Sequence, residues 1–278
     1  MSYFYNTLII FSLIVISPAL SAQPEWVQSL DFPGEARNSA VSFSINGKGF
    51  LGLGVNEASS FADFWQYNPE TGKWTQVADY QGLGRENAVA FVIEGKAYVG
   101  LGRSGTYPDF TYHNDFWCYD PSTDAWTELN AFAGSARYQS VAFHLNGKGM
   151  VMFGANSSGY PTDVWAYDPG SGNWTEKNSF PDQGRTGAFV FNLNETVYVG
   201  HGVNYEGGST NLQNNYHVYN QETDSWKEVD ILPSKITIRN NIFYFSLEGK
   251  GYFGGGINGN ETWQFNPADN SWTLMDVL

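Results

Sequence analysis

The side chains best suited to chemistry in this chain are arginines that recur at one position of an internal repeat. Five of them stand six residues before a phenylalanine and seventeen before a glycine: Arg37, Arg85, Arg137, Arg185 and Arg239. Arg103 lies outside this position. Because a guanidinium group binds a carboxylate or phosphate through two parallel N–H groups, a ring of arginines predicts an anion-binding site. The alternative is structural, because the same groups can hydrogen-bond to oxygens of neighbouring repeats and hold the fold together.

The repeat places each arginine just before a predicted two-stranded hairpin. A turn of the type Asn46-Gly47 follows the phenylalanine, and the fourth repeat departs from it with Asn194-Glu195. Glycine in such a turn is typical of a tight hairpin. The second half of the first repeat carries Asp63, an aromatic run that ends at Pro69, and Trp74, which together predict a third strand, a turn and a fourth strand.

All ten tryptophans fall on two positions of the repeat. The third strand holds Trp65, Trp117, Trp165 and Trp263, and the fourth holds Trp26, Trp74, Trp126, Trp174, Trp226 and Trp272. Four antiparallel strands in a repeat of about fifty residues indicate one blade of a β-propeller. We therefore predict an all-β propeller of four-stranded blades with five complete repeats, in which the tryptophans fill the space between blades.

These motifs resemble the Kelch repeats of secreted, galactose-oxidase-like propellers, and the resemblance covers residues 26–277. Such propellers serve many functions, so the resemblance implies the fold and no particular activity. A galactose-oxidase-like copper site needs a Cys–Tyr thioether beside two histidines, and Cys118 lies on a predicted third strand away from the channel. His201 and His217 have no metal-ligand partners at a recognisable spacing. We expect no metal and no cofactor.

The first strand of a propeller blade lines the central channel, so the arginines and the loops between second and third strands should meet at one mouth. The two longest loops carry Tyr107 and Tyr112 in the second repeat and Tyr205 in the fourth. Loops on a rigid scaffold often carry function, and a tyrosine ring can stack on a sugar or a peptide. We predict ligand binding by these tyrosines and the five repeat arginines, against the alternative that the loops are polar filler.

Two ways of closing the ring are compatible with the sequence. Trp26 begins a fourth-type strand with no strands before it, and five full repeats follow. The chain therefore forms five closed blades with an extra edge strand, or a six-bladed design with a partial sixth blade that lacks three strands. We expect five closed blades.

The net charge and the N-terminal sequence indicate which partners to expect and where the protein is located. The net charge is -14, and no basic stripe is present, so nucleic acid and anionic membrane surfaces are not expected partners. Residues 2–24 are uncharged, with an apolar run from Leu8 to Ile16 and small residues up to Ala22. This pattern predicts a signal peptide over residues 1–22, a propeller over residues 23–278, and a secreted or periplasmic protein with no membrane association after cleavage; a retained anchor is the alternative.

Three functions remain open. The first is a non-enzymatic binding module for an anionic glycan or an acidic peptide at the channel mouth, with a carbohydrate or protein as the partner. The second, implied by resemblance to Kelch-type sialic-acid mutarotases, is a sugar epimerase in which Glu86, Asp109 or Glu206 supplies the acid and base. The third is a structural or adhesive repeat protein with no discrete site.

Overall fold

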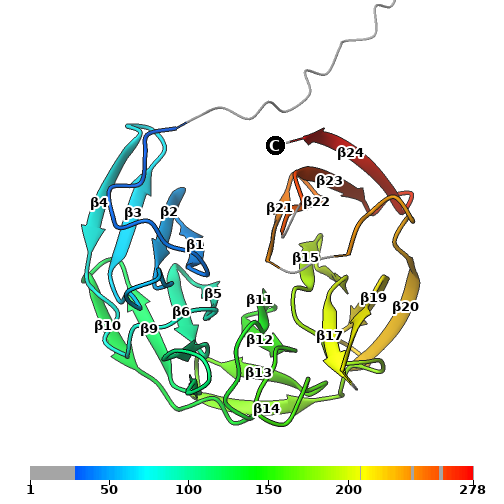
Figure 1. The fold of residues 1–278 in the computed structure, drawn as a ribbon, viewed down its shortest axis with the longest axis horizontal. Coiled ribbons are helices and arrows are strands. Elements are labelled where there is room, and N and C mark those ends of the chain that lie inside the picture. Colours follow the sequence, from blue (N-terminus) through cyan, green and yellow to red (C-terminus); the bar gives the residue numbers. More distant parts are fainter. Residues whose placement is uncertain (1–28, 207, 239–240, 257–258, 278) are drawn as a thin grey trace, which may run out of the picture.

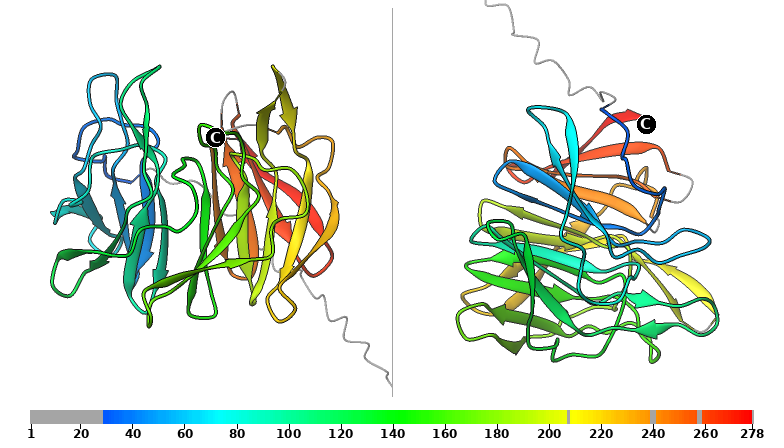
Figure 2. Two further views of the ribbon diagram at one scale, coloured as in Figure 1. Left: turned by 90° about the horizontal axis from the view of Figure 1, so that it is seen from below. Right: turned by 90° about the vertical axis from the view of Figure 1, so that its left-hand side faces the viewer.

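The computed structural model describes residues 29–206, 208–238, 241–256 and 259–277, and these residues form a five-bladed β-propeller (Figure 1). Each blade is an antiparallel sheet of four strands, as the sequence predicts. Figure 2 shows the propeller from two sides, with the strands of each blade running between its two faces. Among the described residues, no helix is long and apolar enough to span a membrane. The predicted signal peptide and Trp26 lie outside the described residues.

The strands of a blade follow one another from the channel to the rim. Blade one holds β1 (Val41–Ile45), β2 (Lys48–Gly52), β3 (Phe64–Asn68) and β4 (Lys73–Val77). Blade two holds β5 (Val89–Ile93), β6 (Lys96–Gly100), β9 (Phe116–Asp120) and β10 (Ala125–Glu128). Blade three holds β11 (Val141–Leu145), β12 (Lys148–Met152), β13 (Val164–Asp168) and β14 (Asn173–Lys177).

The last two blades follow the same plan, with blade four holding β15 (Phe189–Leu193), β16 (Thr196–Gly200), β19 (Asn215–Asn220) and β20 (Ser225–Ile231). Blade five holds β21 (Ile242–Leu247), β22 (Lys250–Gly255), β23 (Glu261–Asn266) and β24 (Ser271–Val277). Two small hairpins extend the long loops: β7 (Arg103–Ser104) with β8 (Thr111–Tyr112), and β17 (Val203–Glu206) with β18 (Ser209–Leu212).

The divergent fourth repeat keeps the hairpin turn of the others. Asn146 and Gly147 have φ angles of 45° and 73°, and Asn194 and Glu195 have 52° and 65°. Two consecutive residues with positive φ match the twist of a two-residue hairpin. The backbone geometry of the turn is therefore preserved where Glu195 replaces glycine.

The hydrophobic core lies between blades rather than inside one layer. Four buried clusters separate the five blades, one at each junction. Between blades two and three, for example, the Tyr167 ring lies 6.3 Å from Phe91 and 5.6 Å from Tyr98, and the Trp174 ring lies 5.0 Å from Phe116. Aromatic packing of this kind locks neighbouring blades together. The loops at the mouth therefore rest on a rigid frame.

Innermost strands join the blades around the channel. β1 contacts β5, β5 contacts β11, β11 contacts β15, and β15 contacts β21. No comparable contact joins β21 to β1 among the described residues, and the ribbon is open between blades one and five (Figure 1). Five blades are thus present, and the expected contact between the first and the last is missing from this part of the chain.

The arginine-bearing linkers meet the loops between second and third strands at one mouth, as predicted. Backbone bridges join Glu86 to Arg103 and Tyr138 to Ala155, and the first and fourth blades have equivalents. The recurring spacing from arginine to glycine follows from this contact, because a Cβ atom on Gly102 would lie 2.6 Å from the Glu86 carbonyl oxygen. The residue after each repeat arginine is thereby fixed at the mouth.

Candidate ligand-binding site

The repeat arginines are paired inside their own blades. Nη2 of Arg85 donates to Oδ2 of Asp115 at 2.9 Å, and Nη1 donates to Oδ1 of the same carboxylate. Nη1 also reaches the Leu101 carbonyl oxygen at 3.1 Å, and Nε donates to the Leu83 carbonyl oxygen at 2.8 Å. The same arrangement recurs in two further blades, at Arg37 with Asp63 and Arg137 with Asp163.

In blade four the repeat arginine, Arg185, has different hydrogen-bond partners. The third strand begins with Asn215 in place of aspartate, and Arg185 donates to its Oδ1 at 3.0 Å. The carboxylate comes instead from Asp182 in the preceding linker, at 3.0 Å from Nη2 of Arg185. Burial raises the pKa of the Asp182 carboxyl, but hydrogen bonds from Asn215 and the nearby Arg185 hold it below its usual value.

These arginines match the structural alternative given above. The side chains of Arg37, Arg85, Arg137 and Arg185 are 3%, 1%, 0% and 0% exposed. Arg239 lies outside the described residues. A buried, bidentate ion pair joins the start of the first strand to the start of the third and leaves no exposed donor edge. Ligand binding by these five arginines stays a prediction, and we build the candidate site on other residues.

Arg103 differs from the repeat arginines in its surroundings. Its Nε donates to Oε1 of Glu86 at 2.7 Å, and its guanidinium lies 3.9 Å from the Phe110 ring and 4.1 Å from the Tyr138 ring. The side chain is 20% exposed. Nη1 and Nη2 make no hydrogen bond with any residue in the described part of the chain. Both faces of the cation are covered, while one edge with two N–H groups stays available.

Tyrosines from three blades lie near Tyr138, the ring that covers one face of this cation. Tyr112 on β8 stacks on Tyr138 with ring centroids 5.6 Å apart. Tyr160, in the loop of blade three, hydrogen-bonds to the backbone of Tyr205 on β17. Burial raises the pKa of Tyr138, and Arg103 and Tyr205 are among the groups close enough to influence it. The structure thus brings Tyr112 and Tyr205 near Tyr138, which contacts Arg103.

Tyr107 does not join this cluster. It stands at the tip of the β7–β8 loop and is 87% exposed. No ring contact or hydrogen bond of its side chain appears among the described residues, which places it apart from Tyr112 on the same hairpin.

The three carboxylates considered for acid–base chemistry differ in exposure and in hydrogen bonding. Glu86 accepts from Arg103 through Oε1 and from Asn87 Nδ2 at 3.1 Å through Oε2, so both oxygens are occupied. Asp109 and Glu206 are exposed on the loops. An acid and a base for ring opening should converge on one bound sugar.

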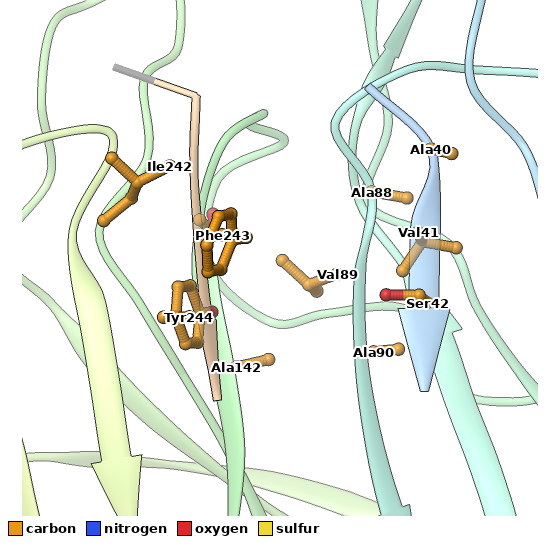
Figure 3. Close-up of a pocket in the computed structure, with 11 residues that line it drawn as sticks. Ala40, Val41, Ser42, Ala88, Val89, Ala90, Ala142, Ile242, Phe243 and Tyr244 are labelled. Atoms are coloured by element: carbon orange, nitrogen blue, oxygen red, sulfur yellow. The ribbon is translucent and has the colours of Figure 1, made fainter. Parts of the chain in front are cut away.

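The channel itself holds a cavity of about 390 Å³ lined mostly by small and apolar side chains (Figure 3). Ala40, Val89 and Phe243 come from three different blades and line it. No carboxylate, imidazole or cation is among its lining residues in the described chain. Within the described residues, this cavity therefore presents no charged side chain to a ligand.

The two histidines of blade four have different packing partners. His201 is fully buried, and its Nδ1 lies 3.0 Å from the Gly187 carbonyl oxygen. His217 packs edge-on to Phe180 at 4.6 Å, and burial lowers its pKa. Within the described residues, no three His, Cys, Asp or Glu side chains are grouped to hold a metal ion. Cys118 is a half-buried free thiol paired in register with Tyr98.

Sequence reasoning missed the central residue of this site. Arg103 does not hold the repeat position of the other five arginines, and that departure is itself the signal. Tyr138 and Phe110 were also missed. Tyr138 follows a repeat arginine at a position that holds Asn38, Glu86 or Thr186 elsewhere, so a large ring there was a second signal.

Comparison with known proteins supports the fold. The family described as the KLHDC2/KLHL20/DRC7 Kelch-repeats domain matches residues 54–202. The structure of YjhT is similar, with a TM-score of 0.78 and 18% sequence identity, over 92% of this chain and 89% of that chain. No curated protein sequence matches this chain. At this level of identity the similarity to YjhT shows the fold alone.

Proposed function

This chain belongs to the Kelch-repeat family of β-propellers, and we propose that it is a secreted, non-enzymatic binding protein for an anionic glycan. The carboxylate of the glycan binds the free edge of Arg103. The single observation that carries the proposal is that Arg103 is clamped by Glu86, Phe110 and Tyr138 with Nη1 and Nη2 unpaired among the described residues.

A clamped guanidinium suits a weakly acidic ligand in a strongly acidic protein. The Phe110 and Tyr138 rings and the Glu86 hydrogen bond fix its plane, so little conformational entropy is lost on binding. A charge-assisted hydrogen bond contributes about 1.5–3 kcal/mol. The surrounding net charge of -14 disfavours a polyacidic peptide more than a sugar with one carboxylate.

The tyrosines supply the second half of the recognition. Tyr112 stacks on Tyr138, which covers one face of the cation, and Tyr205 on a second hairpin lies close enough to Tyr138 to influence its pKa. An aromatic ring can stack on the apolar face of a sugar. A ligand held between hairpins of blades two and four would contact both the carboxylate donor and a ring. We infer that the mouth recognises a carboxylated sugar residue, and that the rings determine which sugar fits.

Isothermal titration calorimetry with glucuronate and N-acetylneuraminate tests the proposal, with glucose as the neutral control. We expect saturable binding of a carboxylated sugar that weakens by 10- to 100-fold in Arg103→Gln. The Lys73→Gln variant removes an exposed cation on β4 and should bind normally. Equal binding by Arg103→Gln and the parent chain would refute the assignment of Arg103.

The mutarotase alternative has its own readout. Nuclear magnetic resonance of freshly dissolved sugar follows anomer equilibration with and without the protein. Because Glu86 has both oxygens occupied, we expect binding without faster equilibration. Acceleration that is lost in Glu86→Gln would overturn the non-enzymatic assignment and retain the site. A chain that binds no tested acidic sugar and accelerates nothing would favour the structural or adhesive function.

A further inference from the structure

A further cavity lies between blades one and two, on the face opposite the mouth. It has a volume of about 430 Å³, and its lining includes Asn46 and Glu94 from the hairpin turns of the two blades. Each turn joins the first strand of its blade to the second, so it lies at the far end of that strand from the arginine-bearing linker. The strands run between the two faces in Figure 2. This cavity is therefore distinct from the site at Arg103.

The lysine that begins the second strand is paired in blades two and three. Nζ of Lys96 lies 2.9 Å from Oδ2 of Asp120, and Nζ of Lys148 lies 3.7 Å from Oδ2 of Asp168. Each aspartate ends the third strand of the same blade. The two lysine side chains are 48% and 47% exposed, so water also solvates these ammonium groups.

Blade one lacks this carboxylate. Its third strand ends at Asn68, whose Oδ1 accepts from the backbone N–H of Glu70 in the turn. Asp120 accepts in the same way from Ser122, so the turn is preserved while the charge is lost. Lys48 is half-buried and makes no ion pair or hydrogen bond with any residue in the described part of the chain. The least exposed of these three lysines is thus the one without a carboxylate, and its hydration is reduced without compensation.

The glutamine beside this lysine is also without a partner in blade one. Gln66 on β3 is half-buried, is paired in register with Phe50 on β2, and lines the same cavity. In blade five, Lys250 Nζ donates to Oε1 of the equivalent Gln264 at 3.3 Å, and Gln264 Nε2 donates to the Tyr252 hydroxyl at 2.7 Å. Phe50 has no hydroxyl, and the Gln66 side chain makes no hydrogen bond with the residues that the structure describes. The cavity therefore presents an amide as well as an ammonium group.

Four charged side chains line the cavity, and two of them, Lys96 and Asp120, neutralise one another. The other two, Lys48 and Glu94, come from different blades and form no ion pair with each other or with another described residue. We propose that this cavity binds a small zwitterion, with its carboxylate on Lys48 and its ammonium group on Glu94. Gln66 donates to the same carboxylate. A cavity of a few hundred cubic ångströms is the usual size of a small-molecule site.

A ligand with a single charge fits this lining less well. A simple carboxylate pairs with Lys48 and leaves Glu94 without a cation, while a simple amine does the reverse. The two free charges of the lining sum to zero, as do those of a zwitterion. Ile45, Phe50 and Pro121 also line the cavity, so the hydrocarbon part of a ligand contacts apolar side chains.

Isothermal titration calorimetry of the full chain tests the ligand class. The probes are leucine and ε-aminocaproate, two isomers in which the ammonium group lies beside the carboxylate or far from it. Caproate and hexylamine carry one charged group each and are the controls. We expect saturable binding of at least one zwitterion and affinities about 10-fold lower, or less, for both controls. Equal affinity for either control, or no binding of either zwitterion, would overturn the proposal.

The variant Asn68→Asp tests the site while keeping Lys48. It supplies the carboxylate that blades two and three have at this position, so Lys48 should pair within its own blade. Affinity for the zwitterion should then fall by about 10-fold or more. Lys148→Met removes the lysine of the same repeat position in blade three and should bind normally. Arg103→Gln should also bind normally, so the result is independent of the carboxylated-sugar site.

Urea denaturation separates lost binding from lost folding. Because Asn68→Asp adds an ion pair and keeps the turn, its unfolding midpoint should not fall below that of the parent chain. Unchanged affinity in both Asn68→Asp and Lys48→Met would show that the ligand does not contact this lysine. An equal loss of affinity in Lys148→Met would likewise reject the cavity between blades one and two as the site.

Discussion

Arg137 and Arg103 lie on neighbouring segments of the mouth and differ in what their terminal nitrogens contact. Arg137 is fully buried, and both Nη atoms donate to Asp163. Arg103 gives only Nε to Glu86 and keeps its outer edge available. One residue type therefore holds the first and third strands together at one position and presents a donor edge at another. The hydrogen-bond partners of each arginine, rather than its residue type, determine whether it stabilises the fold or can bind a ligand.

The strongest test of this contrast is Arg137→Met, which should lower the free energy of unfolding by about 3 kcal/mol. The change leaves the Asp163 carboxylate part-buried without its cation, which costs more than the loss of the pair itself. For a domain of this size the Tm should fall by roughly 6–12 °C. Urea denaturation followed by tryptophan fluorescence measures the change. A loss below about 1 kcal/mol would mean that Arg137 is not a structural tie.

Acid should weaken the same ties in a defined direction. Burial raises the pKa of Asp115 and Asp163, but hydrogen bonds from Arg85 and Arg137 outweigh it and hold both values below 3.8. A carboxyl with a depressed folded pKa stabilises the fold above the unfolded value, and that stability is lost as the pH falls through the folded value. We expect urea midpoints to be flat above about pH 5 and to fall below pH 4.

The variant Asp163→Asn separates this effect from general acid unfolding. It removes one titrating group, so its midpoint should be lower at pH 6 and change less between pH 5 and pH 3. Parallel curves for the variant and the parent chain would show that the Arg137–Asp163 pair does not contribute to the pH dependence.

For Arg103, at the mouth, we expect a substitution to reduce ligand affinity more than stability. Arg103→Met should weaken binding of a carboxylated sugar by 10- to 100-fold, which corresponds to the loss of one charge-assisted interaction of about 1.5–3 kcal/mol. Its unfolding free energy should fall by less than that of Arg137→Met, because Arg103 is 20% exposed and gives Glu86 one hydrogen bond, whereas Arg137 is fully buried and gives Asp163 two. Calorimetry and urea denaturation on the same sample measure both. A large stability loss with unchanged affinity would reverse the roles assigned to Arg103 and Arg137.

The repetition in the sequence explains why the fold was predictable and the site was not. Trp74, Trp126 and Trp174 recur with the same neighbours, so a single alignment of repeats predicted strands, turns and inter-blade packing together. The repeat does not predict how the ring closes, because the residues at the two ends of the ring are not repeated elsewhere. The predicted contact between blades one and five is absent among the described residues. The repeated residues indicate the contacts that every blade needs to stay folded, and the ion pairs of the buried arginines are among these contacts.

Ligand chemistry depends on departures from that repeat. Arg103 and Tyr138 each occupy a position where the other blades have different residues, and they meet only because the Glu86–Arg103 and Tyr138–Ala155 bridges bring two loops to one mouth. Spacing along the chain does not reveal that Phe110 would cover the second face of the guanidinium, because the β7–β8 hairpin folds back on itself.

The smallest expected effect distinguishes two tyrosines of one hairpin. Tyr112 stacks on Tyr138 beside Arg103, so Tyr112→Ala should weaken sugar binding about 5-fold through the loss of one ring contact of about 1 kcal/mol. Tyr107 is 87% exposed at the loop tip, so Tyr107→Ala should leave affinity unchanged. Titration of both variants with the same sugar measures the difference. If Tyr107→Ala proved the weaker binder, the ligand would lie over the tip of the hairpin, and the guanidinium edge would no longer define the site.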